Sequence, residues 1–115
     1  MNPKRGEIWM VNFEPQTGDE IQKERPAVVL NLPVEQVFKL RLVVPFTGWQ
    51  PLFSGRITKV QVQPSPKNGL VKASAADLLQ IRSVSTLRFR RKIGDLEPVI
   101  LTRIASCIAA FIDAP

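Results

Sequence analysis

The chain has 115 residues, with 16 Lys and Arg against 10 Asp and Glu (formal net charge +6), one Cys and no His. This length allows one domain, expected over residues 1–115, and a hydrophobic content of 44% can fill one core. The missing His excludes imidazole acid–base catalysis and imidazole metal ligands, and the single Cys excludes an internal disulfide and a cysteine zinc cluster. We therefore expect neither a metal nor a cofactor.

The excess of positive charge favours a polyanionic partner, which could be a nucleic acid, an acidic protein or a membrane surface. The first residues lead into alternating side chains rather than an apolar run, so we expect no targeting signal. No stretch approaches the roughly 18 apolar residues of a membrane span. The expectation is a cytoplasmic protein that does not enter the membrane.

The first half of the chain predicts strands separated by polar connections. Residues 7–13 alternate as a strand, residues 14–24 form a polar loop, and residues 26–31 are an apolar run typical of a buried strand. Residues 41–47 form another strand, in which Pro45 lacks a backbone donor and therefore indicates an edge or a bulge.

In the second half, residues 56–63 predict a half-exposed strand with Ile57, Val60 and Val62 on one side, ended by a turn at 64–69. Residues 70–76 and 78–84 look extended. Apolar residues from Val99 to Ile112 recur at helical spacing after Pro98, which suits the first helical position. Five or six short strands and one helix predict a mainly β protein, a small bent antiparallel barrel with a C-terminal α-helix packed on it.

Two side chains at strand ends are candidates for chemistry, because sites on small barrels usually lie at the rim. Arg25 opens the buried strand at 26–31, and Thr47 ends the strand at 41–47 at a Thr-Gly step. The residues alone leave other interpretations open: a surface arginine before a proline, and a turn hydroxyl that bonds its own backbone.

The order and spacing of several short motifs resemble the MazF/PemK family of toxins from bacterial toxin–antitoxin pairs, over about residues 4–112. The motifs are Gly6-Glu7-Ile8-Trp9, Gly18-Asp19-Glu20, Arg25-Pro26-Ala27-Val28-Val29, Pro45-Phe46-Thr47, Leu79-Gln80-Ile81-Arg82-Ser83-Val84 and Ile93-Gly94-Asp95-Leu96. The resemblance implies an SH3-like barrel, a homodimer, and sequence-specific, metal-independent cleavage of single-stranded RNA that an acidic antitoxin inhibits. It also implies that Arg25 and Thr47 belong to the catalytic centre.

Such chemistry needs no His, because the 2′-hydroxyl of RNA can attack its own phosphate and leave a 2′,3′-cyclic phosphate and a 5′-hydroxyl. A guanidinium stays charged at any working pH and can hold two phosphate oxygens, so Arg25 would stabilise the negative transition state. Thr47 would hydrogen-bond a non-bridging oxygen.

The proton acceptor is less constrained by the sequence. Some family members have an acidic residue where this chain has Leu79, and some have a His where it has Asp19. Asp19, Glu20 and Asp77 are the acidic candidates, of which Glu20 matches a family position.

RNA contacts are expected from side chains in the loops and in the basic segment 82–92, a pattern that gives salt-sensitive binding. They are Asp19, Lys23, Trp49, Gln80, Arg82 and Arg88. Trp49 could stack on a base or pack in a dimer or loop. The basic segment could instead be a solvated surface, or it could dock an acidic antitoxin tail.

Two other functions remain open at this point. A gyrase-poisoning toxin of the same barrel type typically ends in Trp-Gly-Ile, whereas this chain ends in Phe111-Ile112-Asp113-Ala114-Pro115. A non-catalytic SH3-like module that binds RNA or protein is the third possibility. The single Cys107 lies in the predicted helix without a base to activate it, so we interpret it as a packed apolar residue.

Overall fold

A computed structural model describes residues 1–14, 24–32 and 38–115, and all structural statements below concern these residues. They form seven strands and one α-helix. The elements are β1 (Glu7–Asn12), β2 (Glu24–Val29), β3 (Leu40–Gly48), β4 (Lys59–Val62), β5 (Ser74–Asp77), β6 (Arg82–Ser85), β7 (Phe89–Asp95) and α1 (Pro98–Phe111). Short 3-10 turns occupy residues 51–53, 78–80 and 86–88.

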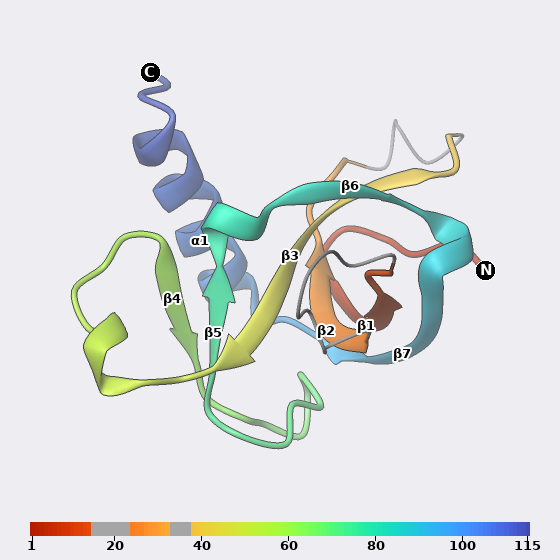
Figure 1. The fold of residues 1–115 in the computed structure, drawn as a ribbon, viewed down its shortest axis with the longest axis horizontal. Coiled ribbons are helices and arrows are strands. Elements are labelled where there is room, and N and C mark those ends of the chain that lie inside the picture. The colour runs from red at the N-terminus through yellow and green to blue at the C-terminus, as the bar shows by residue number, and fades with distance from the viewer. Residues whose placement is uncertain (15–23, 33–37) are drawn as a thin grey trace.

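All strand pairs are antiparallel, in the order β4-β5-β3-β2-β1-β7, with β6 also paired to β3. The outer strands β4 and β7 do not pair with each other, so hydrogen bonds do not close the sheet. It curls instead into a barrel-like shape, with α1 behind β4 and β5 in the view of Figure 1. The predicted mainly β fold with a C-terminal helix is confirmed.

Two apolar clusters lie on opposite faces of the curled sheet. Alternate residues of a strand point to opposite faces, and in β2 Val28 joins one cluster while Ala27 and Val29 join the other. The first cluster packs against α1, where Ile104 is completely buried. The helix begins at Pro98 as predicted, since the missing N–H of Pro has no intrahelical partner at that position.

Strand β3 is central, which corrects the expectation that Pro45 marks an edge or a bulge. Its first half pairs with β2 and β6, and its last residues pair with β5. Leu30 N donates to Leu42 O at 2.8 Å, so the even-numbered residues of β3 exchange bonds with β2. The nitrogen of Pro45 therefore faces the opposite edge of β3, which pairs with β6 and β5. It lies in the gap between these two strands, because β6 pairs with β3 as far as Val43 and β5 pairs with it from Phe46 onward. A proline is tolerated there because no ladder bond is lost.

Other segments differ from the predictions in ways that depend on tertiary contacts. The basic segment contains strand β7, which pairs with β1 and buries Phe89. The extended segment at 70–84 is divided by the turn at 78–80 into β5 and β6. Ile57 precedes β4 and is 51% exposed. Strand β2 starts at Glu24, and the rest of the predicted polar loop lies outside the described residues.

The connection between β4 and β5 is anchored by the fully buried Asn68. Its Oδ1 accepts from the backbone nitrogens of Ser65 (3.0 Å) and Leu70 (2.9 Å), and its Nδ2 donates to Gln63 O (2.9 Å) and Glu97 Oε1 (3.2 Å). The next residue, Gly69, has φ +71°, and a Cβ there would lie 1.9 Å from the carbonyl oxygen of Ile93. Only glycine fits this contact between the connection and β7.

Candidate active site at the ends of β2 and β3

Arg25 and Thr47 line one cavity of about 200 Å³ at the ends of β2 and β3. The other lining residues are Glu24, Pro26, Phe46, Gly48, Lys72 and Ser74. Three elements build the cavity: β2, the end of β3, and the segment that leads into β5. The two residues that the sequence singled out separately are therefore brought together.

The sheet register explains this meeting. Ala27 lies opposite Pro45, and the same register continued by two residues places Arg25 opposite Thr47 on the same face. Pairs of this kind do not exchange backbone hydrogen bonds, so their side chains lie closer than those of bonded pairs. Pro26 has no N–H to give to Phe46, and the paired part of the β2–β3 ladder ends at Ala27. The cavity lies where the two strands stop pairing.

The charges around the cavity are unbalanced. Glu24 is paired with Arg90, with 3.5 Å between Oε2 and Nε. Within the described ranges, neither the guanidinium of Arg25 nor the ammonium of Lys72 has an ion-pair or hydrogen-bond partner. Two uncompensated cations at one cavity attract an anion, and a guanidinium matches phosphate oxygens in geometry.

Sequence reasoning missed Lys72, Glu24 and Ser74 as lining residues. Lys72 precedes β5 by two residues, and Gly48 lies opposite Ser74 in the β3–β5 register. No local pattern in the sequence indicates that this connection reaches the end of β3. Glu24 could have been predicted as a lining residue, because it directly precedes Arg25 in the sequence.

Of the three acidic candidates, Asp77 is the one within the described residues, and it does not line the cavity. Its Oδ1 lies 3.1 Å from Lys59 Nζ, as an ion pair without the alignment of a hydrogen bond, and both side chains are about seven-eighths buried. Lys59 also lies over the ring of Phe53, 5.3 Å from its centroid. Asp77 is thus held in a local ion pair. Asp19, Glu20 and Lys23 lie outside the described residues.

The remaining expected RNA contacts lie outside the cavity. Trp49 is half-buried and packs edge-on against Phe53, with ring centroids 5.8 Å apart. Gln80 is exposed in the turn at 78–80. Arg82 lies opposite Val43 in the β3–β6 register and over the ring of Phe13. Arg88 donates to Asn12 O at 3.4 Å. None of these four side chains lines the cavity that contains Thr47.

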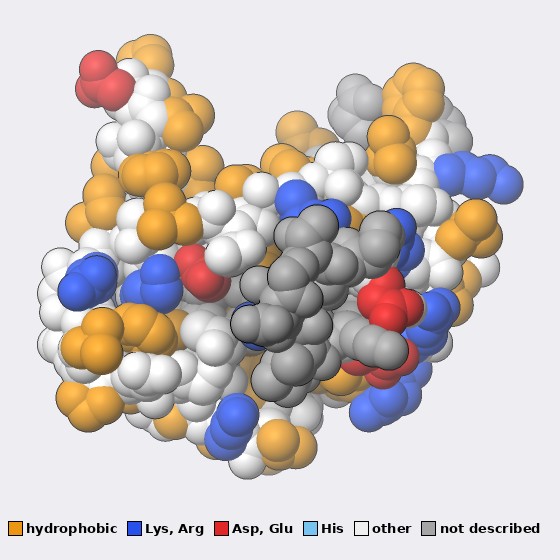
Figure 2. Space-filling model, in the orientation of Figure 1, with side chains coloured by type: hydrophobic (Ala, Val, Ile, Leu, Met, Phe, Trp, Pro, Cys, Tyr) orange, Lys and Arg blue, Asp and Glu red, His pale blue; other side chains and the backbone are white. Residues whose placement is uncertain are grey.

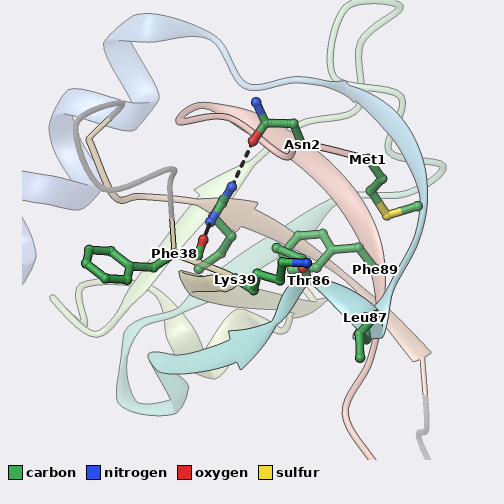
Figure 3. A pocket seen from close by; sticks show the side chains of 8 residues that line it. Met1, Asn2, Phe38, Lys39, Thr86, Leu87 and Phe89 are labelled. Atoms are coloured by element: carbon green, nitrogen blue, oxygen red, sulfur yellow. Dashed lines mark hydrogen bonds between the residues drawn. The ribbon is translucent and has the colours of Figure 1, made fainter.

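A larger cavity of about 480 Å³ lies beside the N-terminus, between the start of β3 and the turn at 86–88 (Figure 3). Its buried cation is Arg41, whose guanidinium donates to Pro3 O, Asn2 Oδ1, Leu40 O and Phe38 O. This guanidinium is committed to holding the N-terminal segment on β3. The cavity contains neither Arg25 nor Thr47, so we place the candidate site at the smaller cavity.

The carboxyl groups with shifted pKa values lie away from the candidate site. Burial raises the pKa of Glu7, but hydrogen bonds from Trp9 and the Lys4 backbone and the contact with Lys92 outweigh it and hold the pKa below its ordinary value. Burial likewise raises the pKa of Glu97, but hydrogen bonds from Ser65 and Asn68 outweigh burial and hold the pKa below its ordinary value. Neither group lines the cavity, so both belong to the fold.

The surface view shows basic side chains spread over the face that carries the ends of β3 and β5, with more along the edge near β7 (Figure 2). No helix within residues 1–14, 24–32 and 38–115 is long and apolar enough to span a membrane. In the same residues, no three His, Cys, Asp or Glu side chains are grouped to hold a metal ion. Cys107 packs partly buried against the core, as predicted.

Comparisons with known proteins agree with this architecture. The endoribonuclease MazF9 of Mycobacterium tuberculosis is 32% identical over 123 residues, covering 96% of each chain. A crystal structure of MazF from Deinococcus radiodurans has a TM-score of 0.74 at 22% identity and covers 98% of each chain. A MazE–MazF crystal structure from the same organism has a TM-score of 0.75 at 17% identity, covering 100% of this chain and 99% of that one.

The model of the PemK-like, MazF-like toxin family of type II toxin–antitoxin systems matches residues 4–112. That range includes both strand ends of the cavity, the connection that carries Lys72, and all of α1. On this match and on the MazF9 relative, the chain belongs to the PemK/MazF family of type II toxins.

Proposed function

We propose that this chain is a toxin endoribonuclease that cuts single-stranded RNA at specific sequences without a metal ion. The observation that carries the proposal is the meeting of Arg25 and Thr47 at one positively charged cavity. The similarity to a relative named as an endoribonuclease supports the reaction class. The 2′-oxygen of the substrate attacks the neighbouring phosphorus, the bond to the 5′-oxygen breaks, and the products are a 2′,3′-cyclic phosphate and a 5′-hydroxyl.

Each residue has a separate task in this reaction. Arg25 holds non-bridging phosphate oxygens as negative charge develops on them, an interaction that gains strength in the transition state. Thr47 donates a hydrogen bond to one of these oxygens and orients the phosphate. Glu20 accepts the proton of the 2′-hydroxyl. DNA lacks this hydroxyl, so it could bind but would not be cut.

The basic side chains outside the cavity guide the RNA strand toward it. Alternation along β3 places Val43 on the same face as Thr47, and Arg82 lies opposite Val43. Arg88 adds charge at the start of β7, while Trp49 offers an aromatic face near the cleavage point. Lys23 and Asp19, which lie outside the described residues, contribute from the segment before β2, and Gln80 contributes from the turn after β5.

The proposed partners are a second copy of this chain and an acidic antitoxin. The MazE–MazF crystal structure from Deinococcus radiodurans, which shares the fold, supports a toxin–antitoxin assembly. The net charge of +6 favours an acidic antitoxin segment that covers the same basic surface as RNA. The cytoplasm, where mRNA and antitoxin are both present, is the proposed site of action.

The test is cleavage of a defined mixture of single-stranded RNAs in EDTA, with the new ends mapped. Wild-type protein should cut at a few sequences and leave cyclic phosphate ends. Arg25→Ala should lower the single-turnover rate by about 10²–10³-fold or more, because it removes a preorganised cation from the transition state. Arg103→Ala is the matched control, since Arg103 is exposed on α1 and does not line the cavity.

Both proteins should keep the circular dichroism and melting temperature of the wild type. Intact RNA across varied sequences would refute the nuclease and favour a non-catalytic binding module. Cleavage that needs added metal would refute the mechanism.

A further inference from the structure

Lys72 reaches the candidate site from the connection that leads into β5. Its Nζ lies 3.4 Å, and its Cε 3.6 Å, from the position that a Cβ at residue 48 would occupy. These are van der Waals distances, so the lysine side chain lies directly against the end of β3. Thr47 is the neighbouring residue, and both line the cavity with Arg25.

The backbone that carries Lys72 is fixed relative to Thr47. Ser74 Oγ donates to Lys72 O at 2.9 Å, and Trp49 N donates to Ala73 O at 3.0 Å. Ser74 also lies opposite Gly48 in the β3–β5 register. The segment on either side of Gly48 is therefore hydrogen-bonded to the segment that follows Lys72, which fixes the backbone that carries the ammonium.

Lys72 differs from Lys59 and Lys92, whose ammonium groups are paired with carboxylates. Lys59 is paired with Asp77 at 3.1 Å, and Lys92 with Glu7 at 3.3 Å and Asp95 at 3.2 Å. Within the described part of the chain, the ammonium of Lys72 has no carboxylate at ion-pair distance. An uncompensated ammonium beside an uncompensated guanidinium fits a phosphodiester that presents two kinds of oxygen, the non-bridging pair and the bridging 5′-oxygen.

We propose that Lys72 is the general acid that protonates the leaving 5′-oxygen, a role that rests on the proposed nuclease function. The bond between O2′ and phosphorus forms while the bond between phosphorus and O5′ breaks. The proton of the 2′-hydroxyl goes to a carboxylate, proposed above as Glu20, and a proton from Lys72 Nζ goes to O5′. Water then returns a proton to Lys72. A guanidinium does not release its proton in proteins, so Arg25 supplies charge and Lys72 supplies the proton.

The test compares two substrates that share the cleavage sequence found by end mapping. One has the natural 5′-oxygen at the scissile phosphate, and the other has sulfur in its place. A thiol has a pKa of about 8.5, far below that of an alcohol, so the sulfur leaves as an anion without help from an acid. Single-turnover rates at saturating protein separate the chemical step from binding.

Lys72→Met should slow cleavage of the oxygen substrate by about 10²–10⁴-fold, the usual contribution of general acid–base catalysis. On the sulfur substrate the same variant should cut at nearly the wild-type rate. Lys72→Arg keeps the charge but not the available proton, so it should behave like Lys72→Met on both substrates. Lys67→Met is the matched control from the same connection, because Lys67 does not line the cavity, and it should cut both substrates normally.

Equal losses on both substrates for Lys72→Met, or normal cleavage of the oxygen substrate by Lys72→Arg, would overturn the role as a proton donor. Arg25→Ala should lose activity on both substrates, which distinguishes charge stabilisation from proton donation. Failure of the wild-type protein to cut any RNA would overturn the proposed function itself. Lys72 is exposed, so all variants should retain the wild-type melting temperature.

Discussion

The buried Asn68 offers a quantitative test of how the β4–β5 connection is held. Replacing it with Ala leaves the backbone N–H groups of Ser65 and Leu70 without their acceptor and removes two donated bonds, to Gln63 O and Glu97. An unsatisfied buried donor costs about 1–3 kcal/mol. Water can hydrate the less buried of the two N–H groups in the variant, so we expect the free energy of unfolding to fall by about 3 kcal/mol in total. This is a large share of the roughly 5–15 kcal/mol that stabilises a typical domain.

Urea unfolding followed by tryptophan fluorescence and by circular dichroism measures this loss. Asn31→Ala is the matched control, because its Oδ1 accepts one backbone bond, from Leu42 N at 3.1 Å in an exposed position. The control should lose less than about 1 kcal/mol. A loss below about 1 kcal/mol for Asn68→Ala would show that the hydrogen bonds of this side chain do not hold the connection in place.

Two further predictions concern the cavity and the pH dependence of stability. Gly48→Ala adds a Cβ at van der Waals distance, 3.4 Å, from Lys72 Nζ, so cleavage should stay near the wild-type rate. Gly48→Leu extends beyond that point and displaces the flexible lysine, so its melting temperature should stay unchanged while RNA cleavage falls by about tenfold or more. An unchanged cleavage rate for Gly48→Leu would contradict the placement of Lys72. The pKa of Glu97 is lowered in the folded protein from its ordinary value of 4.5, so its stabilising effect is complete above that value and is lost as the pH falls through the folded pKa. Urea unfolding across pH 3–7 should therefore show wild-type stability decreasing below about pH 4.5 more steeply than that of Glu97→Gln, and parallel curves would contradict the role of this carboxylate.

The elements that were predicted correctly carry strong local signals. The helix has an apolar period and Pro98 at its first position, β1 has an alternating pattern that sends Ile8 to one cluster and Trp9 and Val11 to the other, and β2 ends in a buried apolar run. Strand β7 was missed because its exposed cations, Arg90 to Lys92, hide the alternation, and its single buried end residue is Phe89. Its identity as a strand comes from pairing with β1, a contact between distant parts of the chain.

The candidate site was predictable to the extent that it lies at strand ends. Arg25 and Thr47 each end a recognisable strand, and the register of β2 on β3 brings them together. Lys72 was not predictable, because its position beside Gly48 depends on the pairing of β3 with β5. The central position of Pro45 likewise depends on where two other strands begin and end.

The central position of β3 determines which molecule must adapt when substrate arrives. One edge of this strand pairs with β6 and then with β5, the other edge pairs with β2 at Val43 to Pro45, and Val43 to Phe46 are almost fully buried. In the proposed mechanism Thr47, which pairs with Ala75 of β5, is preorganised and cannot follow a moving phosphate. The nucleic acid would have to bend its own backbone until its 2′-oxygen stands in line with the leaving group. An unpaired strand rotates freely enough for that, whereas the regular A-form helix resists it, so the stiffness of β3 would by itself select unpaired RNA.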